Sequence, residues 1–153
     1  MTKGRDTNFD FKGFEQTNST EVTLKDGFYV PIVLRGQSAA VGGNYGIEII
    51  ARNAFEVSQI AVRFRVASTS GTLNIEKIRG NGAEGTGVDL CKTDFSLSGA
   101  INTVVTKSGV DLVRDRVVAQ GDSLALVYGG TLTNLEQLVV TIYCKPFGRG
   151  NYR

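Results

Sequence analysis

The fold is decided near the end of the chain, by Val117-Val118-Ala119-Gln120-Gly121-Asp122-Ser123-Leu124-Ala125-Leu126-Val127-Tyr128-Gly129-Gly130 and then by Leu138-Val139-Val140-Thr141-Ile142-Tyr143-Cys144. The first stretch contains a Gly-Asp turn, after which Leu124, Leu126 and Tyr128 face one side of a strand. In the second stretch, alternate apolar residues again share one face. Two such strands separated by a glycine loop predict the end of a two-sheet β-domain, and neither carries a pattern of catalytic residues.

The same alternation extends upstream and is clearest between residues 57 and 66. The apolar face of this strand holds Ile60, Val62, Phe64 and Val66. Arg63 and Arg65 fall on the opposite face. We interpret these two arginines as part of the solvent face of a half-buried sheet rather than as a basic binding strip.

Other strands are expected at regular intervals along the chain. They fall in residues 28–34, 45–51, 72–78, 88–90, 95–97, 101–106 and 110–118. In residues 72–78, Leu73 and Ile75 are expected to point inward, and Lys77 interrupts this apolar alternation. Gly42-Gly43-Asn44 predicts a turn. No window of about 12 residues shows a helical period, so roughly eight or nine strands predict an all-β sandwich or barrel.

Composition indicates one ordered domain with weak charge. The chain has 153 residues, a length that suits a single hydrophobic core. Nineteen of these residues are glycine, above the usual fraction of about 7%, as expected for many turns and bulges. The net charge is only +2, and acidic and basic residues are interspersed. We therefore expect no specific nucleic-acid partner.

Histidine is absent, which removes the commonest general base and neutral metal ligand. Cys91 and Cys144 are too few for a structural zinc site, and we interpret them as free thiols in strands rather than as a disulfide. No cofactor and no metal are expected, although a calcium site built from scattered loop Asp and Asn residues stays open. The N-terminus lacks the apolar region of a signal peptide and no run could cross a bilayer, so we expect synthesis in a cytosol without membrane association.

A glycine motif, Gly80-Asn81-Gly82-Ala83-Glu84-Gly85, matches the dinucleotide-binding pattern and follows an expected strand. Such a site needs a helix to start there, so that its N-terminal amides face the pyrophosphate. Gly87 and another expected strand follow instead. We interpret the motif as a flexible loop between strands.

Two pairs of carboxylates, Asp111 with Asp115 and Asp89 with Asp94, have the residue type that glycosidases use. Spacing along a β-chain does not establish the separation that this chemistry needs. The neighbouring Arg114 and Arg116 favour exposed ion pairs, and no catalytic residue is assigned.

Residues 1–26, the N-terminal arm, are polar and show no sustained period. Phe9, Phe11 and Phe14 nevertheless fall within six positions of one another. Disordered segments contain few aromatics, so an arm that docks these phenylalanines on a neighbour is favoured over a mobile tail.

The order of strand and turn signals from residue 55 onward resembles one family of proteins. The quoted segments are Phe55-Glu56-Val57, Val62-Arg63-Phe64-Arg65-Val66, Thr69-Ser70-Gly71-Thr72-Leu73-Asn74-Ile75, Asn102-Thr103-Val104-Val105, Gly121-Asp122-Ser123-Leu124-Ala125-Leu126 and Leu138-Val139-Val140-Thr141-Ile142. They resemble tailed-bacteriophage virion structural proteins, of the head decoration, head fibre and tail fibre kind, over about residues 45–145.

This resemblance implies a jelly-roll-like antiparallel β-sandwich and does not cover residues 1–44. With the strand pattern, we expect about eight strands in a domain over residues 27–147. The extended arm, residues 1–26, precedes it, and a C-terminal tail, residues 148–153, follows it. The resemblance also implies a homo-oligomer, with a trimer favoured, and partners among other virion proteins such as the major capsid protein. Assembly would take place in the host cytoplasm, and no catalytic residues come with the resemblance.

Three functions follow from these observations. The first is a non-enzymatic virion structural protein, a capsid-exterior decoration or fibre-base protein that self-associates and anchors through its arm. The alternative is a carbohydrate- or receptor-binding module of a tail fibre, with Tyr45, Tyr128 or Tyr143 stacking on sugars. An enzyme ranks third, since without histidine a carboxylate pair would have to carry the reaction.

Overall fold

The computed structural model describes residues 14–17, 21–24, 28–34 and 41–146, with side chains described from residue 49 onward. Phe9, Phe11 and the expected tail 148–153 therefore lie outside the described residues. Within the described ranges the protein is all-β and has one short 3-10 helix, η1 (Gly109–Asp111).

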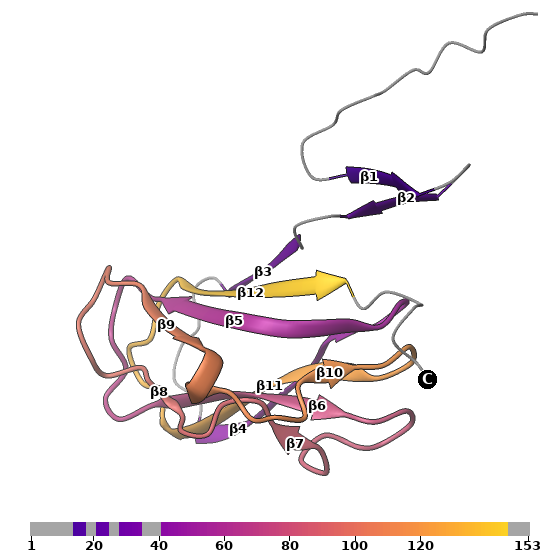
Figure 1. Ribbon diagram of the computed structural model, residues 1–153. Coiled ribbons are helices and arrows are strands. Elements are labelled where there is room, and N and C mark those ends of the chain that lie inside the picture. The colour runs from indigo at the N-terminus through magenta and orange to yellow at the C-terminus, as the bar shows by residue number, and fades with distance from the viewer. Residues whose placement is uncertain (1–13, 18–20, 25–27, 35–40, 147–153) are drawn as a thin grey trace, which may run out of the picture.

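Two antiparallel sheets form the body of the protein (Figure 1). The first contains β3 (Phe28–Leu34), β5 (Phe55–Arg63), β9 (Val105–Ser108), β10 (Val117–Val118) and β12 (Leu138–Pro146). The second contains β4 (Val41–Ile50), β6 (Thr72–Ile78), β7 (Val88–Asp89), β8 (Phe95–Ser96) and β11 (Ser123–Thr131). A separate two-stranded sheet pairs β1 (Phe14–Thr17) with β2 (Glu21–Leu24).

The connectivity is that of a jelly roll. The first sheet runs in the order β10-β5-β12-β3, with β9 also pairing with β5, and the second runs β4-β11-β6-β7, with β8 also pairing with β6. Each sheet thus has four strand positions, and the chain crosses between the sheets at every step except from β6 to β7 and β8 and from β9 to β10, which is the connectivity of two Greek keys. The predicted jelly-roll-like sandwich of about eight strands is confirmed.

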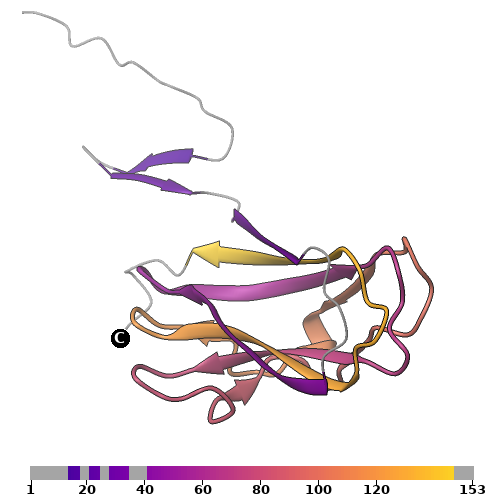
Figure 2. The same cartoon turned by 180° about the vertical axis from the view of Figure 1, so that it is seen from behind.

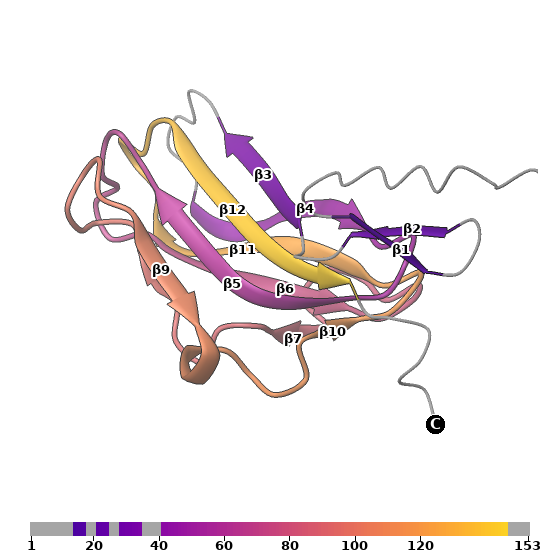
Figure 3. The same cartoon turned by 45° about the horizontal axis from the view of Figure 1, so that its top comes forward.

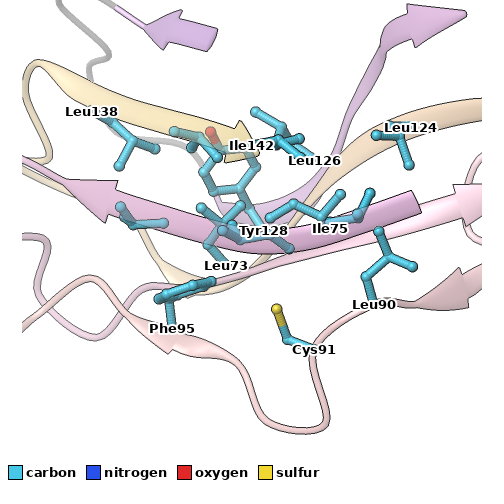
Figure 4. Close-up of a cluster of buried hydrophobic side chains, with 14 of the residues drawn as sticks. Leu73, Ile75, Leu90, Cys91, Phe95, Leu124, Leu126, Tyr128, Leu138 and Ile142 are labelled. Carbon is cyan, nitrogen blue, oxygen red and sulfur yellow. The ribbon is translucent and has the colours of Figure 1, made fainter. Parts of the chain in front are cut away.

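The core lies between the two sheets, where alternate residues of the long strands meet (Figure 4). Leu124, Leu126 and Tyr128 of β11 are buried, as their alternation predicted. Leu138, Val140, Ile142 and Cys144 of β12 are also buried. Burying one such aliphatic side chain fully is worth about 1.5–3 kcal/mol, so these interleaved faces supply most of the stability.

The Gly-Asp turn before β11 joins three loops at one end of the sandwich. Gly121 has a φ of 89°, which favours glycine, and its amide donates to the carbonyl of Ala51 at 2.9 Å. The carboxylate of Asp122 accepts from the amides of Ala119 and Gly80, each at 3.1 Å. The turn is therefore tied to the loops that follow β4 and β6.

Hydrogen bonds join the two sheets along the side that holds β7 and β9. The amide of Lys92 donates to the carbonyl of Asp111, and that of Val113 donates to Leu90, each at 2.9 Å. Cys91 and Leu112 form an antiparallel bridge between these bonds. Backbone hydrogen bonds therefore link the two sheets on this side of the sandwich.

Glycines mark the places where the predicted strand boundaries are wrong. The turn predicted at Gly42-Gly43-Asn44 lies inside β4, and the loop predicted at Gly129-Gly130 lies inside β11. These two strands pair with repeated register shifts, and Gly130 has a φ of 65°. Glycine at such bulges lets the strand continue through an irregular ladder. In the segment 101–106, by contrast, only the part from residue 105 is strand.

Lys77 does not break the alternation of β6 but continues it into the interior, where it is 1% exposed. Its ammonium lies 2.7 Å from Oδ1 of Asp115 and donates to the carbonyls of Asp115 and Val117 at 3.0 and 3.1 Å. Hydrogen bonds from Lys77 and then Arg79 lower the pKa of Asp115. The lysine thus ties β6 in one sheet to the segment leading into β10 in the other.

The two thiols are free and buried, as predicted, and should be unreactive in the folded protein. Burial raises the pKa of Cys91 to about 11 and that of Cys144 to about 12. At pH 8 only about a thousandth of Cys91 would be thiolate.

We expect a thiol reagent such as DTNB to label neither cysteine in the native protein at pH 8, and to label both in guanidinium. Rapid native labelling would contradict this burial.

Candidate assembly surface

The N-terminal hairpin of β1 and β2 belongs to neither sheet of the sandwich. Among the residues that the structure describes, its strands pair with each other alone, from Phe14 opposite Leu24 to Thr17 opposite Glu21. Figures 1 and 2 show it beyond β3, apart from the two sheets. Phe14 is thereby placed at the start of β1, while Phe9 and Phe11 lie outside the described residues. A docking role for these three phenylalanines remains a prediction.

A second unusual feature is a run of exposed apolar residues around β9. Six large hydrophobic residues are exposed among the described side chains, and four of them fall between residues 101 and 110. They are Ile101, Val104, Val105 and Val110, with exposed fractions of 52%, 60%, 44% and 82%. Exposed apolar side chains gathered in one short segment mark a candidate interaction site, whereas single scattered ones are ordinary. We call these four residues the β9 strip.

The backbone beside the strip is also open. Among the described residues β9 pairs with β5 alone, which leaves its other edge without a partner strand. Lys107 carries the only charge between residues 101 and 110. Its ammonium donates to the hydroxyl of Thr93 at 2.6 Å and lies 5.1 Å from the ring centroid of Phe95. The lysine is held against the other sheet, so the strip itself is uncharged.

The glycine motif is a loop between β6 and β7, as predicted, and its amides bind a carboxylate of this chain. Both Gly85, at 2.9 Å, and Gly87 donate backbone hydrogen bonds to Glu76, whose side chain is buried. A Cβ at Gly87 would overlap the carbonyl oxygen of Lys77. With Glu76 on these amides and strand β7 starting at Val88, the loop has no helix N-terminus to offer a pyrophosphate.

Of the four aspartates considered in the sequence, Asp115 forms ion pairs, and its partners come from a distant part of the chain. Asp115 pairs with Lys77 and Arg79, each at 2.7 Å, and the neighbouring Arg116 pairs with Glu56 at 2.7 Å. The pKa of Asp89 is raised, first by burial and then by the charges of Asp94 and Glu76. Among the described residues, no group of three or more His, Cys, Asp or Glu is placed to hold a metal ion.

The tyrosines proposed for sugar stacking are placed differently from one another. Tyr128 is 3% exposed and packs in the core, which removes it from any binding face. Tyr143 is half-buried, and the side chain of Tyr45 lies outside the described side chains. Arg63 and Arg65 are exposed beside the buried Ile60, Val62 and Phe64, which confirms their solvent-face interpretation.

Comparison with known proteins shows no family for this chain. No protein-family model matches the chain, and no curated protein matches it significantly. One solved structure, described as a Bacillus endospore appendage from a family of disulfide-linked pili, is similar over 86% of this chain and 100% of its own. The identity is 13% and the TM-score 0.37, too low to support any argument about function.

Within the part of the chain that the structure describes, no helix is long and apolar enough to span a membrane.

Proposed function

We propose that this protein is a non-enzymatic structural subunit of a tailed-phage virion, a capsid-exterior decoration or fibre-base protein that self-associates and anchors through its N-terminal arm. The observation that carries the proposal is the β1–β2 hairpin, which within the described ranges of the chain pairs with neither sheet. An isolated two-stranded hairpin is only marginally stable in water. Packing against another subunit would give the hairpin the additional contact that stabilises a two-stranded sheet.

The rest of the described chain supports an assembly role. Jelly rolls build viral capsid domains and lectins alike, so the fold by itself does not choose between them. The choice rests on the hairpin, on the apolar β9 strip and on the resemblance in strand order to virion proteins. Partners would be further copies of this chain, with a trimer expected, and a virion protein such as the major capsid protein.

Removal of residues 1–26 tests the arm. The jelly roll should fold without them, because its two sheets and core begin at β3. We expect the truncated chain to keep the far-ultraviolet circular dichroism of a β-protein but to lose its place on virus particles. The measurement is occupancy on particles assembled with the full or the truncated chain. Wild-type occupancy by a folded truncated chain would contradict the proposal.

A further inference from the structure

We propose that the β9 strip of one molecule receives the N-terminal arm of a second copy, so that subunits join head to tail. The inference rests on the proposed function and assigns the surface to which the arm binds. Three observations carry it: the place where the arm leaves the sandwich, the place of the strip, and the chemistry of the two segments.

The arm and the strip lie at opposite edges of the same sheet. β3, which follows the arm, and β9 occupy opposite edges (Figure 3). Three strand spacings separate these edges, or about 14 Å. Along the strands, Phe28 is level with Cys144 and Val57, whereas Val105 is level with Val62. The five residues from Val57 to Val62 add about 17 Å.

The chemistry of the strip suits an extended segment with apolar side chains. An added strand can pair with the open edge of β9, and Val104 and Val110 are exposed to receive aromatic side chains. The arm brings Phe9, Phe11 and Phe14 within six positions.

A contact between two different surfaces can repeat from one subunit to the next. Each subunit offers an arm at one edge of the sheet and a strip at the opposite edge, so every subunit can bind one neighbour through each. Such heterologous contacts close into a ring, as a trimer would, when the rotation between subunits allows it, and otherwise extend as a filament.

Two complementary variants test the contact. The first lacks residues 1–26 and keeps only the strip, and the second carries Val104→Ser with Val110→Ser and keeps only the arm. Both valines are exposed, so the second variant should fold normally. We expect each variant alone to be monomeric, and an equimolar mixture to form dimers and nothing larger, because one arm then meets one strip. Sedimentation velocity measures these species.

The matched control is Ile50→Ser, which replaces an equally exposed apolar residue on β4, outside the strip. It should assemble like the wild type, whereas the strip variant should need an assembly concentration higher by about tenfold or more.

Four results would overturn the inference. They are wild-type assembly by the strip variant, dimers of the truncated chain alone, monomers in the mixture, and a wild-type chain that is itself monomeric. If the strip variant assembles like the wild type, or if the wild-type chain is monomeric, the occupancy of the truncated chain on particles still tests the proposed function separately. Dimers of the truncated chain alone would show strip-to-strip contact, and monomers in the mixture would show that the arm of one chain does not bind the strip of another.

Discussion

Replacing Lys77 with alanine is expected to lower the free energy of unfolding by about 3 kcal/mol. The lysine stem is fully buried between the sheets, so its loss leaves a cavity. The carbonyls of Asp115 and Val117 also lose the ammonium to which they are bonded. Both effects act at the junction between β6 and β10. Urea unfolding followed by circular dichroism measures the change.

Two companion variants separate the causes. Lys77→Met keeps most of the buried volume and removes only the charge and its hydrogen bonds, so it should cost about 1–2 kcal/mol. Lys92→Ala, at an exposed position, should change stability by less than about 0.5 kcal/mol. If Lys77→Ala behaved like Lys92→Ala, the lysine would not be buried between the sheets.

Replacing Gly130 with alanine should destabilise the protein by a similar amount, about 3 kcal/mol. Gly130 has a φ of 65°, and a Cβ there would overlap the carbonyl oxygen of Ser70. That oxygen belongs to backbone, so it cannot turn aside as the end of a side chain could. The expected loss of unfolding free energy is therefore the sum of two costs. One is the left-handed backbone conformation, and the other is the steric overlap with Ser70.

Gly80→Ala is the matched control for this effect. Gly80 has a φ of 51°, and a Cβ there would meet nothing within 4 Å. It should cost only the conformational part, about 1–2 kcal/mol. Thermal unfolding of both variants beside the wild type measures the difference, and equal losses would show that the overlap with Ser70 is absent.

The strands predicted correctly are those whose two faces differ in burial. Ile60, Val62 and Phe64 alternate with Ala61 and Arg63, and the buried residues of β12 alternate with half-buried ones in the same way. Period-two burial of this kind is a local property of the sequence. It sufficed to predict both sheets and the assignment of alternate β11 and β12 residues to the core.

The features missed depend on contacts between distant parts of the chain. Lys77 is buried because the segment at Asp115, 38 residues away, folds over it. Asn74 lies on the outer face of β6, yet it is buried because its side-chain amide bonds both the N–H and the carbonyl of Cys91. Local periodicity cannot reveal which strand face a later loop will cover.

The candidate surface was only partly predictable. The arm and its phenylalanines were singled out from composition, but nothing in the polar arm predicted the hairpin of β1 and β2. For the segment that contains most of the β9 strip, the sequence predicted an ordinary strand over residues 101–106. Exposure of Val104 and Val110 becomes visible only when β9 is placed at the edge of its sheet with no strand beyond it.

The central claim is that the jelly roll is an assembly subunit whose arm makes the contact. The most direct measurement is the molar mass of the purified full chain and of residues 27–153, determined by sedimentation equilibrium over a range of concentrations. The account predicts oligomers for the full chain and monomers for the truncated one at the same concentration. Equal masses for the two chains at every concentration would contradict it.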